Sequence, residues 1–170
     1  MRCNHACLLT ALAAVLLVAC SAQAWCAVSF AHSASDSIAP FLVVGELSLF
    51  SNKQEAVQGA KALVATGLAT ELLKFTVRER RPNSDSTTSF PSGHTSAAFA
   101  MATVLADYKP AYKLPAYAVA SAIGWSRVEV GAHRWGDVVA GALLGHFIAR
   151  RFTNDHIAVS AQGIGVQWRW

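Results

Sequence analysis

The chain has 170 residues, of which 54% are hydrophobic and only 14% are charged. Globular proteins average about 45–50% apolar and about 25% charged residues. This composition therefore excludes a disordered chain and favours a membrane-related or unusually apolar helical protein. The formal net charge of +4 is too small to indicate nucleic acid as a partner, but it suits anionic substrates or an anionic membrane surface.

The N-terminal segment, residues 1–24, has the features of a secretory signal or anchor. Arg2 precedes an apolar run that ends in small residues, as in a signal peptide. Three fates stay open: cleavage after Ala24 in the motif A-Q-A, lipidation of Cys20 in the lipobox-like L-V-A-C, or retention as a helix. All three place the rest of the chain outside the cytoplasm. We expect the periplasmic side of a bacterial cell envelope, with the protein secreted or membrane-associated.

All four cysteines lie in the first 26 residues, at Cys3, Cys7, Cys20 and Cys26. The main domain, which we expect over residues 25–155, is therefore held together without disulfides and has no cysteine metal site.

Hydrophobic periodicity and breaker residues predict about five helices after the N-terminal segment. The expected ranges are 37–50, 52–81, 92–108, 114–127 and 135–152. We therefore expect an all-α, compact helical bundle. Its apolar runs are shorter than the roughly 17–25 residues of a membrane span, which favours a buried bundle, with short spans as the alternative. Alternating apolar residues in the tail, residues 156–170, predict a short strand or extended segment.

The first chemical motif is a basic cluster before Pro82. On a continuous helix, Lys74, Arg78 and Arg81 would follow i, i+4, i+7 spacing and share one face. Such a face can bind an oxyanion, because arginine offers a planar fork and lysine a point charge. A solvated basic face is the alternative.

The second motif, F-P-S-G-H-T-S at residues 90–96, lies where a polar loop enters an apolar helix. Free N–H groups at a helix N-terminus bind anions. Ser92 can cap the helix or contact an oxyanion, Gly93 allows close backbone approach, and His94 can donate a proton near neutral pH. A plain serine cap with an exposed histidine is the alternative.

The third motif combines Arg127 with His133 and Asp137. The four-residue spacing allows Asp137 to orient one imidazole nitrogen and leave the other nucleophilic, whereas a structural His–Asp pair is the alternative. A metal site at His94, His133 and Asp137 is disfavoured, because no metal-binding spacing supports it.

Together the motifs K-x6-R-P, P-S-G-H and S-R-x5-H-x3-D, in this order over residues 74–137, resemble the type 2 phosphatidic acid phosphatase (PAP2) superfamily. That superfamily includes bacterial non-specific acid phosphatases and vanadium haloperoxidases. The resemblance implies a PAP2-type bundle and a phosphatase.

The resemblance also implies a role for each motif residue. Phosphate would be bound by Lys74, Arg81, Arg127, Ser92 and the Gly93 N–H. His133 would attack phosphorus to form a phosphohistidine, Asp137 would orient His133, and His94 would protonate the leaving oxygen. No cofactor or metal is implied, and vanadate would act as an inhibitor.

The implied substrate is a phosphorylated lipid or lipid diphosphate of the cell envelope. The alternatives are a broad acid phosphatase acting on small phosphoesters, a vanadium-dependent haloperoxidase with vanadate as cofactor, and a non-enzymatic envelope protein. We expect membrane association and no nucleic acid, while the oligomeric state is not indicated. Gly141 and Gly145 are expected to permit close helix packing, and His146 to be a packed histidine.

Overall fold

The structure is a computed structural model, and it describes residues 27, 29–153, 157–160 and 163–166. The predicted signal segment and all four cysteines lie outside these residues. Residues 29–36 are helical and lead through a turn at Ser37 into the first long helix.

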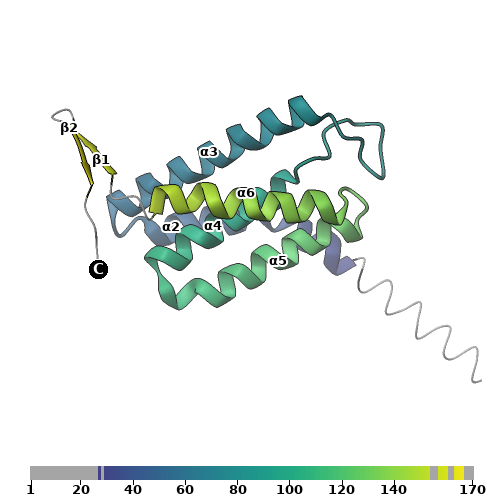
Figure 1. Cartoon of the computed structure of the whole chain (residues 1–170). Helices are drawn as coiled ribbons and strands as arrows, with labels where there is room; N and C mark the ends of the chain where they lie inside the picture. The colour runs from purple at the N-terminus through teal and green to yellow at the C-terminus, as the bar shows by residue number, and fades with distance from the viewer. Residues whose placement is uncertain (1–26, 28, 154–156, 161–162, 167–170) are drawn as a thin grey trace, which may run out of the picture.

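Five long helices follow in the described part of the chain (Figure 1). They are α2 (Ile38–Leu49), α3 (Lys53–Val77), α4 (Gly93–Tyr108), α5 (Lys113–Glu129) and α6 (Trp135–Thr153), with a 3-10 turn at Pro110–Tyr112. Helix α4 packs against all four others and contributes half of the buried core residues, more than any other helix. The predicted all-α bundle is therefore confirmed, with α4 at its centre.

The C-terminal tail contains a two-stranded hairpin that projects beyond one end of the bundle (Figure 1). Strand β1 (Ile157–Ser160) pairs antiparallel with β2 (Gly163–Val166), and Ile157 lies opposite Val166. The predicted strand in this tail is thus confirmed as far as Val166. Its expected continuation through Trp168 and Trp170 lies outside the described residues.

Helix α3 is packed with its large apolar residues outward. Its buried residues are small or hydroxylated: Gly59, Ala62, Thr66 and Thr70. Its large apolar side chains form an exposed stripe: Val57, Val64, Leu68, Leu72 and Phe75. In a protein surrounded by water the opposite arrangement is normal, whereas small residues line the contacts between helices in lipid.

Exposed apolar side chains also cover α2 and α6. On α6 they recur every fourth residue, at Trp135, Val139, Leu143 and Phe147, each more than half exposed. Within the described residues, each helix is too short or too polar to cross a bilayer by itself.

Close contact between α4 and α6 depends on two glycines of α6. A Cβ atom at Gly141 would lie 2.6 Å from the Ser92 carbonyl oxygen, and one at Gly145 would lie 2.0 Å from that of Ser96. Any side chain at either position would push α4 away from α6. The two glycines therefore permit close helix packing, as the sequence predicts.

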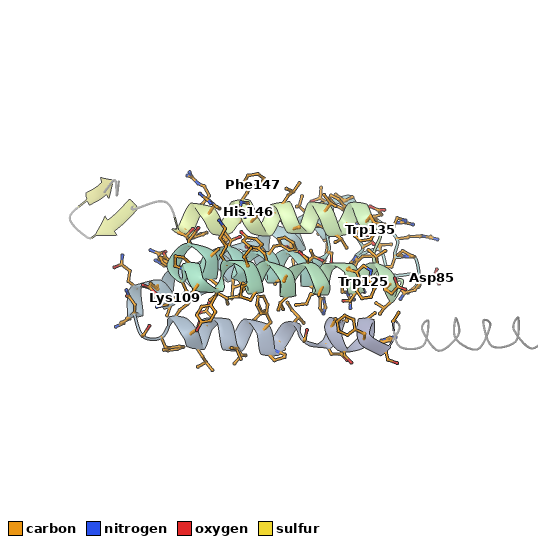
Figure 2. All side chains as sticks on the ribbon, turned by 90° about the horizontal axis from the view of Figure 1, so that it is seen from below. Asp85, Lys109, Trp125, Trp135, His146 and Phe147 are labelled. Carbon is orange, nitrogen blue, oxygen red and sulfur yellow. The ribbon has the colours of Figure 1, made fainter. Side chains whose placement is uncertain are left out.

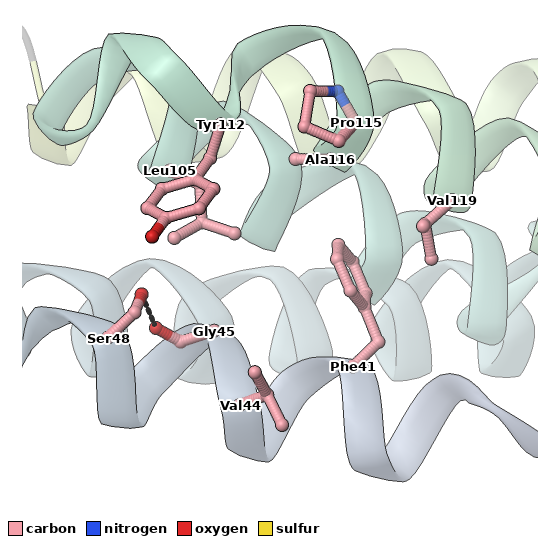
Figure 3. Close-up of a pocket in the computed structure, with 9 residues that line it drawn as sticks. All are labelled: Phe41, Val44, Gly45, Ser48, Leu105, Tyr112, Pro115, Ala116 and Val119. Carbon is pink, nitrogen blue, oxygen red and sulfur yellow. Dashed lines mark hydrogen bonds between the residues drawn. The ribbon is translucent and has the colours of Figure 1, made fainter.

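A cavity of about 230 Å³ separates α2 from α5 (Figure 3). Phe41 and Val44 line it from α2, and Leu105, Pro115 and Val119 line it from α4 and α5. The cavity adjoins the C-terminal end of α4 and the start of α5. It is thus at the opposite end of these helices from the three sequence motifs.

Candidate active site

The three motifs meet at one end of the bundle. The end of α3, the loop 78–92, the start of α4 and the turn between α5 and α6 all lie there (Figure 1). Figure 2 shows the same end from below, with Asp85, Trp125 and Trp135 near it and Lys109 at the opposite end.

The first motif differs from its prediction. Helix α3 ends at Val77, and Arg78 adopts a left-handed conformation with φ of 51°. The predicted extension to residue 81 is therefore wrong, as is the shared helix face for Lys74, Arg78 and Arg81. Proline disfavours helical backbone only at the residue directly before it, here Arg81, whereas the helix already ends at the left-handed cap residue Arg78. Arg78 is exposed and lies over the Phe75 ring, 5.1 Å from its centroid.

Hydrogen bonds in loop 78–92 fix the position of Arg81. The Arg81 N–H donates to the Ser86 carbonyl, and the Ser89 N–H donates to the Glu79 carbonyl, both at 2.9 Å. Arg134, in the turn before α6, donates to the Glu79 carboxylate at 2.7 Å and to the Arg80 carbonyl at 3.0 Å. These contacts turn Arg81 back toward the bundle although it lies outside the helix.

The second motif forms the N-terminus of α4. Ser92 is fully buried, and its hydroxyl accepts from Thr95 at 2.9 Å and does not cap the helix. Its N–H donates to the Asp137 carbonyl at 3.0 Å. A Cβ atom on Gly93 would lie 3.2 Å from the Lys74 ammonium nitrogen. The missing side chain at Gly93 thus lets this cation approach the helix N-terminus.

The third motif contains a buried histidine and carboxylate. His133 is 2% exposed and Asp137 is 1% exposed. The His133 Nδ1 lies 3.5 Å from the Asp137 Oδ2, close enough for charge interaction but without a hydrogen bond. Oδ2 instead accepts from the Ser89 hydroxyl at 2.5 Å and from the Arg134 N–H at 3.0 Å.

The contacts of Ser89 and Arg134 with the Asp137 carboxylate were not predicted from the sequence. Both hold the carboxylate that faces the buried histidine. No signal distinguishes Ser89 from its neighbours, because it is one of several Ser and Thr residues in a loop. Only the return of that loop onto α6 gives it a partner.

Burial and nearby positive charges lower the pKa values of both motif histidines. The pKa of His133 is lowered to about 4, chiefly by burial and then by Arg81 and Arg127, against smaller raising effects of Asp137 and the Ser89 backbone. The pKa of His94 is lowered by burial, then by Arg127, Lys74 and Arg81, while Asp36 raises it. Arg81 and Arg127 thus lower the pKa of both imidazoles, and Lys74 lowers that of His94 alone. With a pKa of about 4, His133 is neutral at neutral pH.

Three buried nitrogens of this site have no hydrogen-bond partner among the described residues. They are Arg81 Nε, Arg127 Nε and His133 Nδ1. Buried polar groups in folded proteins are nearly always paired, so unpaired cationic donors beside a helix N-terminus indicate an anion-binding site. Within the described residues, no three His, Cys, Asp or Glu side chains are grouped to hold a metal.

The chain thus forms a helical bundle with a cluster of cationic side chains near a buried histidine. The sequence model of the PAP2 superfamily matches residues 56–159, more than half of the chain. The chain therefore belongs to the PAP2 superfamily.

One curated relative is similar in sequence over part of its length. The chain is 31% identical to a lipid A 1-phosphatase of Porphyromonas gingivalis, over 67% of this chain and 29% of that protein. It thus spans less than a third of the length of that curated relative.

Two crystal structures are similar to the bundle. LpxE of Aquifex aeolicus matches with a TM-score of 0.59 and 29% identity, over 73% of this chain and 81% of that one. The transmembrane PAP2-type phosphatidylglycerolphosphate phosphatase of Bacillus subtilis matches with a TM-score of 0.55 and 25% identity, over 73% of each chain.

Proposed function

We propose that this chain is a membrane-associated phosphatase that hydrolyses lipid phosphates of the bacterial envelope. One observation carries the proposal: unpaired nitrogens of Arg81, Arg127 and His133 are buried together at one site. Two guanidinium groups and a neutral imidazole form a site that binds a phosphate and can attack it.

In the proposed first step, His133 attacks phosphorus through Nε2, because Nδ1 faces Asp137. A nitrogen–phosphorus bond forms as the bond to the leaving oxygen breaks. His94 gives its proton to that oxygen, so the lipid leaves as an alcohol. The burial that lowers the pKa of His133 keeps its lone pair available for this attack.

In the second step, water attacks the phosphohistidine while His94 takes up a proton, and inorganic phosphate and free His133 result. Negative charge on the transferring phosphoryl group is stabilised by Lys74, Arg81 and Arg127, together with Ser92 and the Gly93 N–H. These fixed cations supply the charge that Mg²⁺ supplies in many phosphoryl-transfer enzymes, so the proposed reaction needs no metal.

The outer surface favours a lipid substrate over a small phosphoester. The exposed stripe on α3 and the matching residues on α6 form apolar faces that suit contact with lipid. An enzyme held at a membrane by such faces meets phosphate groups that are attached to lipids. The relatives whose names identify lipid phosphates as substrates support the same class.

The test uses the full chain in detergent micelles with EDTA present. Phosphate release is measured from lipid A, phosphatidic acid and a small aryl phosphate, with His133→Ala as control. We expect the wild-type chain to release phosphate from the lipids and the His133→Ala variant to release none. Release from the aryl phosphate alone contradicts the lipid proposal, and activity that EDTA removes and a divalent ion restores contradicts metal independence. Vanadate-dependent bromide oxidation without phosphate release would indicate a haloperoxidase.

A further inference from the structure

Arg127, one of the cations of the proposed phosphate site, is held from two directions. Its backbone carbonyl accepts hydrogen bonds from the N–H groups of Ala132 at 3.1 Å and His133 at 3.0 Å. Its side chain donates through Nη1 to the hydroxyl of Ser35, which is 5% exposed. Arg127 therefore links the helical segment 29–36 to the turn that carries His133.

The bond to Ser35 occupies one part of the guanidinium and leaves another part free. The group is planar and presents its five donors in a fixed arrangement. Fixing Nη1 therefore fixes the direction of Nε as well. That Nε is buried and has no partner among the described residues, so it remains available to an oxyanion.

Two further contacts place the segment 29–36 against the site. Trp125 lies on α5, two residues before Arg127. The centroid of the Phe30 ring is 6.2 Å from the centroid of the Trp125 ring. The carboxylate of Asp36 is close enough to raise the pKa of Arg127 and that of His94, in each case against a larger lowering by burial. This segment precedes residue 56, where the match to the family begins.

We propose that Ser35 is a positioning residue of the phosphate site, whose hydroxyl holds Nη1 of Arg127 so that Nε can bind an oxyanion. The segment 29–36 then belongs to the active site although it lies outside the part of the chain that matches the family. The inference rests on the proposed function only in assigning a phosphate oxygen to Arg127.

The test measures the binding of inorganic phosphate to the full chain in detergent by calorimetry, which does not require turnover. Ser35→Ala is expected to weaken binding about tenfold, the usual effect of losing a hydrogen bond to a charged group. Ser35→Thr keeps the hydroxyl and should restore most of the affinity. Ser33→Ala is the matched control, because Ser33 is exposed in the same segment and its hydroxyl donates to the Ser29 carbonyl of its own helix.

A second pair of variants separates positioning from a general structural role. In an Arg127→Ala background, Ser35→Ala should cause no further loss of phosphate affinity, because its effect passes through Arg127. A loss that persists undiminished in that background overturns the inference, as does a Ser35→Ala protein that binds phosphate like Ser33→Ala.

Parallel assays of phosphate release from phosphatidic acid and lipid A keep this inference distinct from the proposed function. If the wild-type chain hydrolyses the lipids and Ser35→Ala leaves phosphate binding unchanged, the role of Ser35 is refuted and the proposed function is not. Ser35-dependent phosphate binding in a wild-type chain that hydrolyses neither lipid refutes the lipid phosphatase and supports the role of Ser35.

Discussion

Two histidines in different regions of this bundle have different surroundings: His133 is buried and His146 is half-buried. Both His133, before α6, and His146, within α6, have a pKa lowered first by burial. His146 Nδ1 lies 3.0 Å from the hydroxyls of both Thr103 and Tyr117. His133 Nδ1 has no hydrogen bond among the described residues and lies 3.5 Å from Asp137 Oδ2, and Arg81 and Arg127 lower the pKa of the ring.

The difference teaches that burial by itself does not identify a reactive histidine. The hydroxyls around His146 saturate its Nδ1 and connect α4, α5 and α6, as a structural network does. Arginines lie near His133, and its Nδ1 has no hydroxyl partner of this kind among the described residues. Figure 2 shows His146 on the flank of the bundle, beside Phe147 and away from the motif end.

Replacing the two histidines tests this comparison most strongly. We expect His133→Ala to reduce phosphate release from lipid substrates by more than about 10³-fold, since it removes the proposed nucleophile. His146→Ala should keep turnover and lose about 1–2 kcal/mol of stability through its hydrogen bonds. Turnover and thermal unfolding are measured on both proteins. A His146→Ala protein that folds but is inactive would remove the distinction.

The next largest effect concerns the arginines of the first motif. Arg81→Ala is expected to lower kcat/KM by about 10–100-fold, because it removes a guanidinium group that would bind the phosphate. Arg78→Ala is the matched control, because Arg78 lies on the Phe75 ring and does not contact the site. Steady-state kinetics measure kcat/KM of both variants. Equal decreases in kcat/KM would indicate that Arg78 and Arg81 act together, as the predicted shared helix face implied and the structure excludes.

The pH dependence sharpens the electrostatic part of the comparison. His133 must be neutral and His94 protonated, so kcat/KM should fall below about pH 4, the pKa of His133. It should also fall as the pH rises through the pKa of His94, which lies below its ordinary value of 6.5. An acidic optimum follows.

The Arg81→Ala variant should also shift the pH profile of kcat/KM in a defined direction. Arg81 lowers the pKa of both histidines, so Arg81→Ala should move both limbs of the pH profile to higher pH. Profiles of kcat/KM, which report the free enzyme, measure this. A wild-type optimum above pH 7, or limbs that move to lower pH, would contradict the assigned roles.

The smallest expected effect is on stability and concerns how α4 is held beside α6. Gly145→Ala should destabilise the protein by about 1–3 kcal/mol, because the new Cβ would overlap the Ser96 carbonyl. Gly67→Ala, with open space around the added atom, should be neutral or stabilising by up to about 1 kcal/mol. Thermal unfolding of the two variants compares them directly, and equal stabilities would show that α4 and α6 can separate without cost.

Much of the fold follows from local sequence. Asn52, the first residue of the predicted range 52–81, caps α3 through its side chain, which accepts from the Gln54 N–H at 3.0 Å, and asparagine favours that position. The start of α4 after Ser92 and the start of α6 at Trp135 were also predicted from local signals. The end of α3 was not, because the chain leaves the helix several residues before the proline that marks the break.

The sequence by itself determined which chemical groups the protein carries. The spacing of His133 and Asp137 and the order of the three motifs were sufficient to indicate the PAP2 superfamily. Helical periodicity also gave the number of long helices. The His133–Asp137 spacing and the helical periodicity are local, since each depends on residues within a few turns of one another, and the order of the motifs can be read directly along the chain.

Only the tertiary structure decided how those groups meet. It placed Arg81 at the site through a loop, gave Asp137 its bonds from Ser89 and Arg134, and brought Ser35 to Arg127. It also turned the large apolar residues of α3 outward. Each result depends on contacts between residues far apart in the chain, which the packing of whole helices determines and local sequence patterns do not encode.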